Sequence, residues 1–307
     1  MRLIGKYLNL FKKAAVAFVE DNALKLSASL SYYMVFALGP IILIVITLAG
    51  SFINRENVNT KVFSELSKLL GPEAAVQIQS IIVNTQGSHH STAGTIIGIV
   101  ALFFGATGVF GEIQDSINYI WSVKAKPQRG WVRFLINRLL SFSIIISMGF
   151  ILLVSLAVNA IMELLSERLV RLFSEGTVYL FYTVNLLLIF IVITTLFAAI
   201  FKILPDAHIR WRDAIIGAAF TAVLFLAGKF LIGYYLGNSN IGVVYGTAAS
   251  IIFILLWVYY SSVILYFGAE FTRMHAIIMG GGIQPDKTAV FIIKKEAREI
   301  PESHLDT

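Results

Sequence analysis

Apolar residues run through this chain in long, nearly unbroken stretches, without the apolar/polar alternation that is typical of barrel strands. A helix needs about 20 mainly apolar residues to cross a bilayer, because each residue advances about 1.5 Å through about 30 Å of hydrocarbon. Six stretches have this length: 27–53, 93–121, 138–162, 177–204, 214–236 and 246–273. The pattern therefore predicts an all-α, polytopic integral membrane protein with six transmembrane helices in residues 27–273.

Shorter amphipathic segments flank these stretches. Residues 1–26 place Leu10, Ala14 and Phe18 at helical spacing among lysines, which predicts an N-terminal cytoplasmic helix lying at the membrane interface. Residues 54–92 contain two helical patterns, which predict a helical cap on the outer, periplasmic face. Residues 163–173 predict one further short amphipathic helix, and residues 274–307 predict a flexible cytoplasmic tail.

Composition and charge support the membrane interpretation and give an orientation. The chain is 57% hydrophobic and only 14% charged, whereas a soluble domain carries about 25% charged residues. Most of the 24 Lys and Arg residues fall in the N-terminal arm, the second and fourth connections and the tail. Positive residues favour the cytoplasmic side, so both termini are expected there. This asymmetry also accounts for the net charge of +6 without nucleic acid as a partner.

One stripe of small and acidic residues follows the second predicted span. Its members recur every three or four residues: Gly94, Gly98, Ala101, Gly105, Gly108, Glu112 and Asp115. Small residues at this spacing let a neighbouring helix approach closely, so the first five are predicted packing positions. The two carboxylates are then expected to face protein or a cavity. They form either an ion pair at the border, with Arg138, Arg210 or Arg212, or part of a proton or cation path.

Further residues within the spans are candidates for a substrate path. Lys229 lies well inside the fifth span, where it either snorkels to outer headgroups or meets an anionic substrate group. Pro40 follows Gly39 about midway along the first span and predicts a kink, which is either a hinge or a structural feature. Glu270 lies near the end of the last span. The predicted substrate or ion pathway therefore comprises Pro40, Glu112, Asp115, Lys229 and Glu270.

Signatures of enzymes and metal sites are missing from the sequence. The chain has no Cys, and its five His residues do not form HExxH or another metal-ligand spacing. Neither a phosphate-binding GxxxxGK[ST] loop nor a GxSxG elbow occurs. We therefore expect no cofactor, no metal and no enzymatic activity, with membrane lipids as partners. The sequence leaves open whether the protein forms a homo-oligomer.

The order of several short motifs resembles a known family. In the second half these are Leu204-Pro205, Trp211-Arg212-Asp213, Gly217-Ala218, Tyr245-Gly246, Trp257-Val258-Tyr259 and Gly268-Ala269-Glu270-Phe271; in the first half they are Asp21, Tyr32-Tyr33 and Pro40. Together they resemble the YihY/virulence factor BrkB family of bacterial inner-membrane proteins. The resemblance extends over about residues 21–273.

The resemblance implies a six-span protein of the cytoplasmic membrane, from a family linked to virulence and serum resistance in which export of lipid or another solute has been proposed. An older family label, ribonuclease BN, has no support here, because the cytoplasmic loops lack the clustered ligands of a metal-dependent nuclease. Two functions are therefore expected as alternatives. One is a transporter or flippase-like exporter of an anionic or amphiphilic substrate, and the other is a non-transporting envelope scaffold or partner-binding protein.

Overall fold

A computed structural model describes residues 2–34, 108–126, 175–237 and 249–294 of the chain. Its named helices are α1 (Arg2–Glu20), α7 (Glu175–Ile203), α8 (Trp211–Gly237) and α10 (Ala249–Ile278). Residues 23–34 and 108–120 are also helical. Four short strands complete the described part: β1 (Val123–Ala125), β2 (Ala207–His208), β3 (Gln284–Pro285) and β4 (Ala289–Phe291). Helices thus dominate, as the apolar pattern predicts.

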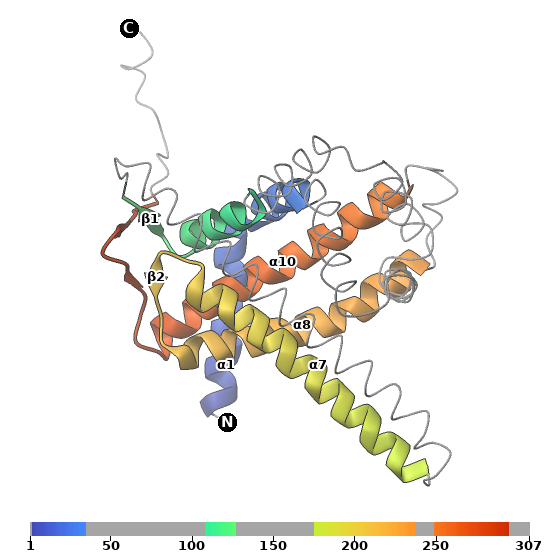
Figure 1. Ribbon diagram of the computed structural model, residues 1–307. Helices are drawn as coiled ribbons and strands as arrows, with labels where there is room; N and C mark the ends of the chain where they lie inside the picture. Colours follow the sequence, from blue (N-terminus) through green and yellow to red (C-terminus); the bar gives the residue numbers. More distant parts are fainter. Residues whose placement is uncertain (1, 35–107, 127–174, 238–248, 295–307) are drawn as a thin grey trace, which may run out of the picture.

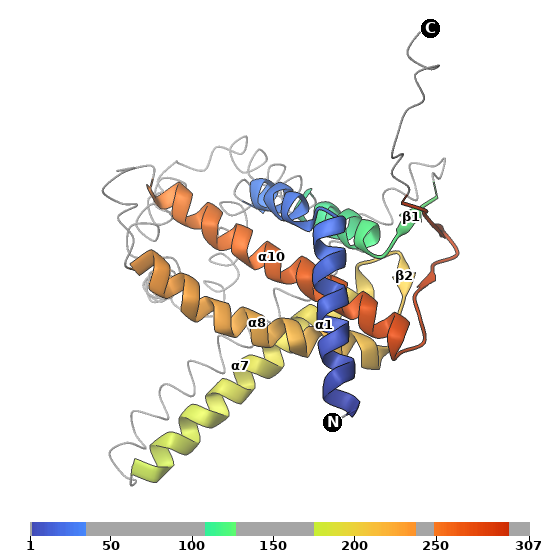
Figure 2. The ribbon, with the colours of Figure 1, turned by 180° about the vertical axis from the view of Figure 1, so that it is seen from behind.

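The three longest described helices are α7, α8 and α10. α8 packs against both α7 and α10, and α1 crosses α10 (Figures 1 and 2). α7, α8 and α10 overlap the predicted stretches 177–204, 214–236 and 246–273 to within a few residues. Within the described residues, α7 and α8 contain stretches long and apolar enough to cross a membrane, Leu186–Ile203 and Trp211–Gly228. The topology with six spans stays a prediction.

Local sequence explains where these helices end. α7 ends just before Leu204-Pro205, because a residue preceding proline disfavours helical dihedrals. α10 ends before three glycines, where the Gly280 N–H donates to the His275 carbonyl (3.1 Å) and the Gly282 N–H to the Ala276 carbonyl (2.9 Å). Gly282 adopts φ +78°, a left-handed conformation that glycine reaches without steric cost. The chain therefore turns at the end of α10, and β3 then pairs with β2 in the connection between α7 and α8.

Two glycine–threonine pairs hold α8 and α10 together in antiparallel register. A Cβ added at Gly217 would lie 1.9 Å from the Thr272 hydroxyl oxygen, and one at Gly268 would lie 2.0 Å from that of Thr221. Each threonine hydroxyl donates at 2.7 Å to the glycine carbonyl one turn before it on its own helix. The hydroxyls are thereby satisfied within the seam, and the helices approach more closely than larger side chains would allow.

The apolar face of α1 packs on protein. Leu10, Ala14 and Phe18 are buried, and the Phe18 ring meets Phe267 of α10 edge-on at 5.6 Å. α1 ends at Glu20, and Asn22 adopts φ +53° before helix resumes at residue 23. Asn tolerates this left-handed conformation better than most residues. A helix is thus present over residues 2–20, with Leu10, Ala14 and Phe18 packed on protein, and its place at the cytoplasmic membrane interface stays a prediction.

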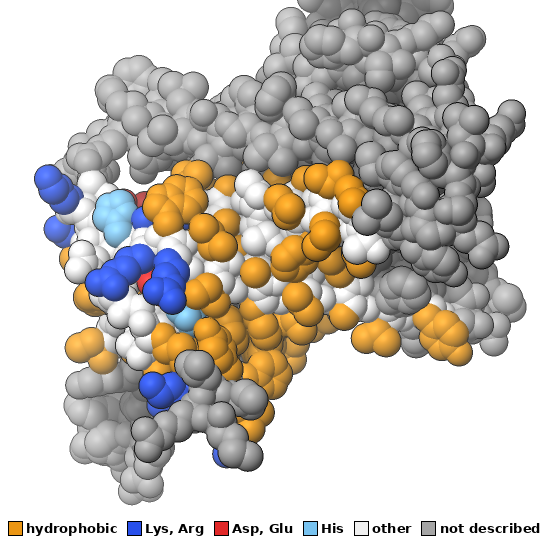
Figure 3. All heavy atoms as spheres, turned by 90° about the horizontal axis from the view of Figure 1, so that it is seen from below, with side chains coloured by type: hydrophobic (Ala, Val, Ile, Leu, Met, Phe, Trp, Pro, Cys, Tyr) orange, Lys and Arg blue, Asp and Glu red, His pale blue; other side chains and the backbone are white. Residues whose placement is uncertain are grey.

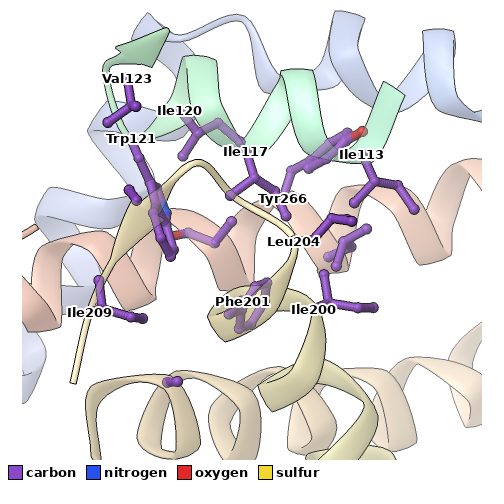
Figure 4. Packing of buried hydrophobic residues seen from close by; sticks show 14 of the residues in the cluster. Ile113, Ile117, Ile120, Trp121, Val123, Ile200, Phe201, Leu204, Ile209 and Tyr266 are labelled. Atoms are coloured by element: carbon purple, nitrogen blue, oxygen red, sulfur yellow. The ribbon is translucent and has the colours of Figure 1, made fainter. Parts of the chain in front are cut away.

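A hydrophobic core joins the 108–120 helix to α7 and α10. Ile113, Ile117 and Ile120 project from one face of that helix towards the end of α7 and towards Tyr266 of α10 (Figure 4). Trp121 is 1% exposed, and its indole Nε1 donates to the Ala269 carbonyl at 3.1 Å. The indole N–H is thus paired inside the core, as a buried polar group requires.

The segment 280–294, here called the C-terminal strap, differs from the sequence-based expectation. Residues 274–278 belong to α10, and the strap then pairs with two distant connections instead of forming a flexible tail. β3 pairs antiparallel with β2, and β4 pairs antiparallel with β1. These ladders satisfy backbone groups that a mobile tail would leave to water. They are also the described exceptions to the all-α prediction.

Several predicted features lie outside the described residues. They are the cap 54–92, the span 138–162, the short helix 163–173, most of the first two spans, Pro40, and the packing positions Gly94, Gly98, Ala101 and Gly105.

Candidate functional site

The segment Gly268–Phe271 of α10 lies where several elements meet. Gly268 packs closely against Thr221 of α8, and the Ala269 carbonyl accepts a hydrogen bond from the Trp121 indole N–H. Phe271 stacks on Phe220 of α8, with ring centroids 3.8 Å apart. Glu270 is fully buried. This short motif thus packs against α8 and the residues that follow the 108–120 helix, and it holds one carboxyl group inside the protein.

Glu270 belongs to an ion network that also contains Asp21, Arg273 and Lys294. The Arg273 Nη1 donates to Asp21 Oδ2 at 3.2 Å and lies 3.4 Å from Glu270 Oε2. Lys294 Nζ lies 2.6 Å from the same Asp21 oxygen. The network therefore ties the end of α1 and the C-terminal strap to α10.

Burial makes this arrangement costly unless the charges compensate one another. Asp21 is 6% exposed and Glu270 is 0% exposed, while the side chains of Arg273 and Lys294 are 19% and 23% exposed. Two carboxylates face two cations, so the network is neutral when all four groups are ionised. Removing one partner from such a group leaves an uncompensated buried charge, which is strongly destabilising.

One carboxylate oxygen of the network lacks a hydrogen-bond partner among the described residues. Within the described part of the chain, Glu270 Oε1 is buried and has no hydrogen-bond partner. A buried carboxylate oxygen without a donor is unfavourable for the ionised form. The site therefore holds a carboxyl group with capacity for a further proton or cation.

Two neighbouring groups fix the cations. The Arg273 Nη2 donates to the Ser122 hydroxyl at 3.3 Å. Lys294 Nζ lies 4.2 Å from the centroid of the Tyr119 ring, a favourable cation–π contact. Burial lowers the pKa of the Lys294 ammonium below its ordinary value, and the Asp21 carboxylate opposes that shift.

Two further polar pairs lie at the same end of the helices. The amide of Asn118 donates to the Asp206 carboxylate at 2.7 Å, and its oxygen accepts the Asp206 backbone N–H at 2.9 Å. Asp213, in the first turn of α8, places Oδ1 3.0 Å from Nδ1 of His275 on α10. These pairs hold the connection between α7 and α8 against the 108–120 helix and α10.

The other predicted pathway residues are dispersed. On the 108–120 helix, Glu112 is partly exposed and Asp115 is exposed, because the buried face is the one that carries Ile113 and Ile117. The expectation that both carboxylates face the interior is therefore not met at Asp115. Lys229 lies on α8, but its side chain is outside the described part, as is Pro40. Of the three predicted pathway residues whose side chains are described, Glu270 alone belongs to the ion network.

Gly108 is the one predicted packing glycine that the structure describes. A Cβ there would lie 3.2 Å from the Tyr33 ring of the 23–34 helix, which makes it a close-packing position. Among the described residues, no group of three or more His, Asp or Glu side chains is placed to hold a metal ion.

Glu270 was a predicted pathway residue, but the ion network that joins it to Asp21, Arg273 and Lys294 was not predicted. Asp21 appeared only as part of the family pattern, and Lys294 only as a charge in the tail. One available signal was position, because Asp21, Asp206 and Asp213 each lie at or beside a helix end. Another was the repeated spacing of Gly217 and Thr221 with Gly268 and Thr272.

Comparison with known proteins places the chain in a family. The family model described as Virulence factor BrkB matches residues 14–289. A UPF0761 membrane protein of Pseudomonas aeruginosa (strain LESB58) is 31% identical over 257 residues, which cover 82% of this chain and 59% of the relative. One from Janthinobacterium sp. (strain Marseille) is 25% identical over 308 residues, which cover 96% of this chain and 68% of the relative.

The chain thus spans about three fifths of the length of the first of these relatives. No solved structure matches it. The resemblance drawn from the sequence motifs is confirmed by this family match, and the matched range contains Asp21, Glu270 and Arg273. The chain belongs to the virulence factor BrkB family of membrane proteins.

Proposed function

We propose that this protein is an ion-coupled transporter of the bacterial cytoplasmic membrane that moves an anionic or amphiphilic substrate, such as a lipid. The observation that carries the proposal is Glu270, a fully buried carboxyl group with one unpartnered oxygen, held within a balanced ion network. Ionisable groups held away from water in membrane proteins commonly mark ion or substrate paths.

Charge balance suggests how such a site works. When Glu270 takes up a proton, Asp21 is left as the one carboxylate facing Arg273 and Lys294. The surplus positive charge then favours the approach of an anionic group. When Glu270 loses its proton, its carboxylate competes for Arg273 and favours release of that group. Proton binding and anion binding are coupled in this scheme, and each promotes the other.

The position of the network suggests how the coupling reaches the rest of the protein. Asp21 follows α1, Glu270 and Arg273 lie on α10, and Lys294 belongs to the C-terminal strap. A change in charge at Glu270 alters the contacts that join these three segments. Glu112, Asp115, Lys229 and Pro40 remain proposed members of the same pathway. The termini are proposed to face the cytoplasm.

The test is transport by the purified protein in liposomes. Labelled anionic phospholipids and small amphiphilic anions are supplied as substrates, and their movement across the bilayer is measured. We expect movement with the unmodified protein and a rate at least about tenfold lower with Glu270→Gln. A tenfold loss corresponds to an activation barrier that is about 1.4 kcal/mol higher. Glu20→Gln, the same change at an exposed residue that ends α1, serves as the matched control.

Three results would change the proposal. Equal rates for Glu270→Gln and Glu20→Gln would remove Glu270 from the mechanism. Equal rates with and without protein would reject transport of these substrates. An absence of movement for every substrate under every gradient would favour the alternative of a non-transporting envelope scaffold.

A further inference from the structure

A surface patch at the connection between α7 and α8 combines cations with exposed apolar side chains. It comprises Lys202, Ile203, Arg210, Trp211, Arg212 and Ile215 and is called the hairpin patch. The apolar stretch of α7 ends at Ile203, and that of α8 begins at Trp211. The hairpin patch therefore lies where both candidate spans pass from apolar to polar sequence.

The exposed side chains of the patch are of two kinds. Ile203, Trp211 and Ile215 are 53%, 56% and 49% exposed. Arg210 and Arg212 are exposed beside them. Lys and Arg side chains gather at this end of the described surface, while hydrophobic side chains cover much of the rest (Figure 3). Trp with neighbouring Arg or Lys is the combination found at headgroup level in membrane proteins.

Lys202 and Arg210 have contacts that hold them in place before any ligand arrives. Lys202 Nζ donates to the Ile209 carbonyl and lies 5.8 Å from the centroid of the Trp211 ring. The Arg210 carbonyl accepts the N–H groups of Asp213 and Ala214 at the start of α8. A Cβ added at Gly281 would lie 2.4 Å from Arg210 Nε, so the absence of a side chain at Gly281 makes room for the guanidinium group. A prearranged site loses less entropy on binding.

The nearby carboxylates are occupied by other partners. Asp213 contacts His275, Asp206 accepts from Asn118, and Asp286 lies 3.0 Å from His208. Among the described residues, no carboxylate lies within ion-pair distance of Lys202, Arg210 or Arg212. Positive charge therefore remains available at the boundary of the apolar surface.

We propose that the hairpin patch binds the headgroup of an anionic phospholipid. Arg210 and Arg212 contact the phosphate, Lys202 adds positive charge, and Trp211, Ile203 and Ile215 lie against the upper acyl chains. Guanidinium groups suit phosphate oxygens because they donate two parallel hydrogen bonds. This binding site is separate from the ion network and does not depend on the proposed transport.

The experiment measures lipid retention by the full chain in detergent, using native mass spectrometry. Phosphatidylglycerol, phosphatidylcholine and inorganic phosphate are the three probes. We expect preferential retention of phosphatidylglycerol and a loss of about thirtyfold in its affinity for Arg210→Gln combined with Arg212→Gln, since each cation near an anionic lipid surface contributes about a factor of five. Lys124→Gln combined with Lys287→Gln removes the same charge from two exposed strap-side positions and should leave affinity unchanged.

Salt dependence gives a second readout that needs no variant. Retention of phosphatidylglycerol by the unmodified protein should fall as salt rises, because the contact is between exposed charges. Equal losses in the two double variants, equal retention of the two lipids, or retention insensitive to salt would each overturn the proposal. Displacement of the lipid by inorganic phosphate at equal concentration would show that free phosphate is the ligand, which also overturns it.

Discussion

At the scale of single residues, Gly217 and Gly268 are positions of very close packing between α8 and α10. Each lies so close to a threonine of the facing helix that a Cβ added there would overlap the threonine side chain. The sequence shows the two Gly and Thr spacings plainly. It does not show that they face each other, because that depends on the antiparallel register of α8 and α10.

We predict that Gly268→Ala lowers the free energy of unfolding by about 1–3 kcal/mol, as expected when an extra methyl group is forced into a packed interface. Thermal unfolding in detergent measures the change. Gly111→Ala is the matched control, since a Cβ at this helical position meets nothing within 4 Å. The control should stabilise slightly, because alanine favours helix over glycine.

A companion substitution separates steric crowding from other causes. Thr221→Ala removes the atoms that lie closest to the new methyl group. It should restore part of the stability lost in Gly268→Ala. An unchanged unfolding temperature in Gly268→Ala, or no restoration by the companion change, would show that the helices do not meet at this register.

The ion network gives a second residue-scale prediction. Arg273→Gln should destabilise the protein by about 3–5 kcal/mol, because Asp21 and Glu270 both lose their shared cation. Glu270→Gln should cost less, since it leaves Asp21 paired with both cations. In the Arg273→Gln background, adding Glu270→Gln should recover stability. Chemical denaturation measures all three, and an equal cost for the two single variants would contradict this charge balance.

At the scale of elements, sequence reasoning succeeded where the signal was local. α7, α8 and α10 are nearly continuous apolar stretches, so their existence and approximate bounds follow from composition along the chain. The C-terminal strap was misjudged for the opposite reason. β3 and β4 are two and three residues long, and their partners β2 and β1 lie far away in the sequence. Such pairing leaves no local pattern.

The strap carries its own prediction. Lys294→Gln removes the contact with Asp21 and should loosen the β1–β4 ladder and the flanking hydrogen bond from the Lys126 N–H to the Thr288 carbonyl (2.7 Å). Hydrogen exchange of peptides covering 123–126 and 289–292 should accelerate about two- to fivefold, the effect of losing a modest ion pair. Lys287→Gln, at an exposed position of the same strap, is the control. Unchanged exchange would show that Asp21 does not anchor the strap.

At the scale of the whole molecule, the orientation of α8 can be tested directly. The chain has no Cys, so single cysteines can be labelled without background. Tyr234 and Lys287 are exposed and lie beyond opposite ends of the apolar stretch Trp211–Gly228. Tyr234→Cys and Lys287→Cys should react with an impermeant reagent from opposite sides of the membrane, Lys287→Cys from the cytoplasm. Labelling of both from one side would exclude α8 as a span.

The candidate site was only partly predictable at this scale. The sequence alone pointed to Glu270 as an acidic residue near the end of an apolar stretch. Its network required the fold, because Asp21, Arg273 and Lys294 come from three segments that tertiary packing brings together. Asp115 illustrates the reverse case, since a regular helical spacing does not say which face is buried.

Substrate flux under an imposed pH gradient shows whether protonation of Glu270 is coupled to transport. Liposomes containing equal amounts of folded protein are compared with and without the gradient. If the two are coupled, the flux responds to the gradient for the unmodified protein and for Glu20→Gln, and it does not respond for Glu270→Gln. A gradient response that persists in Glu270→Gln, or none in the unmodified protein, would contradict this coupling.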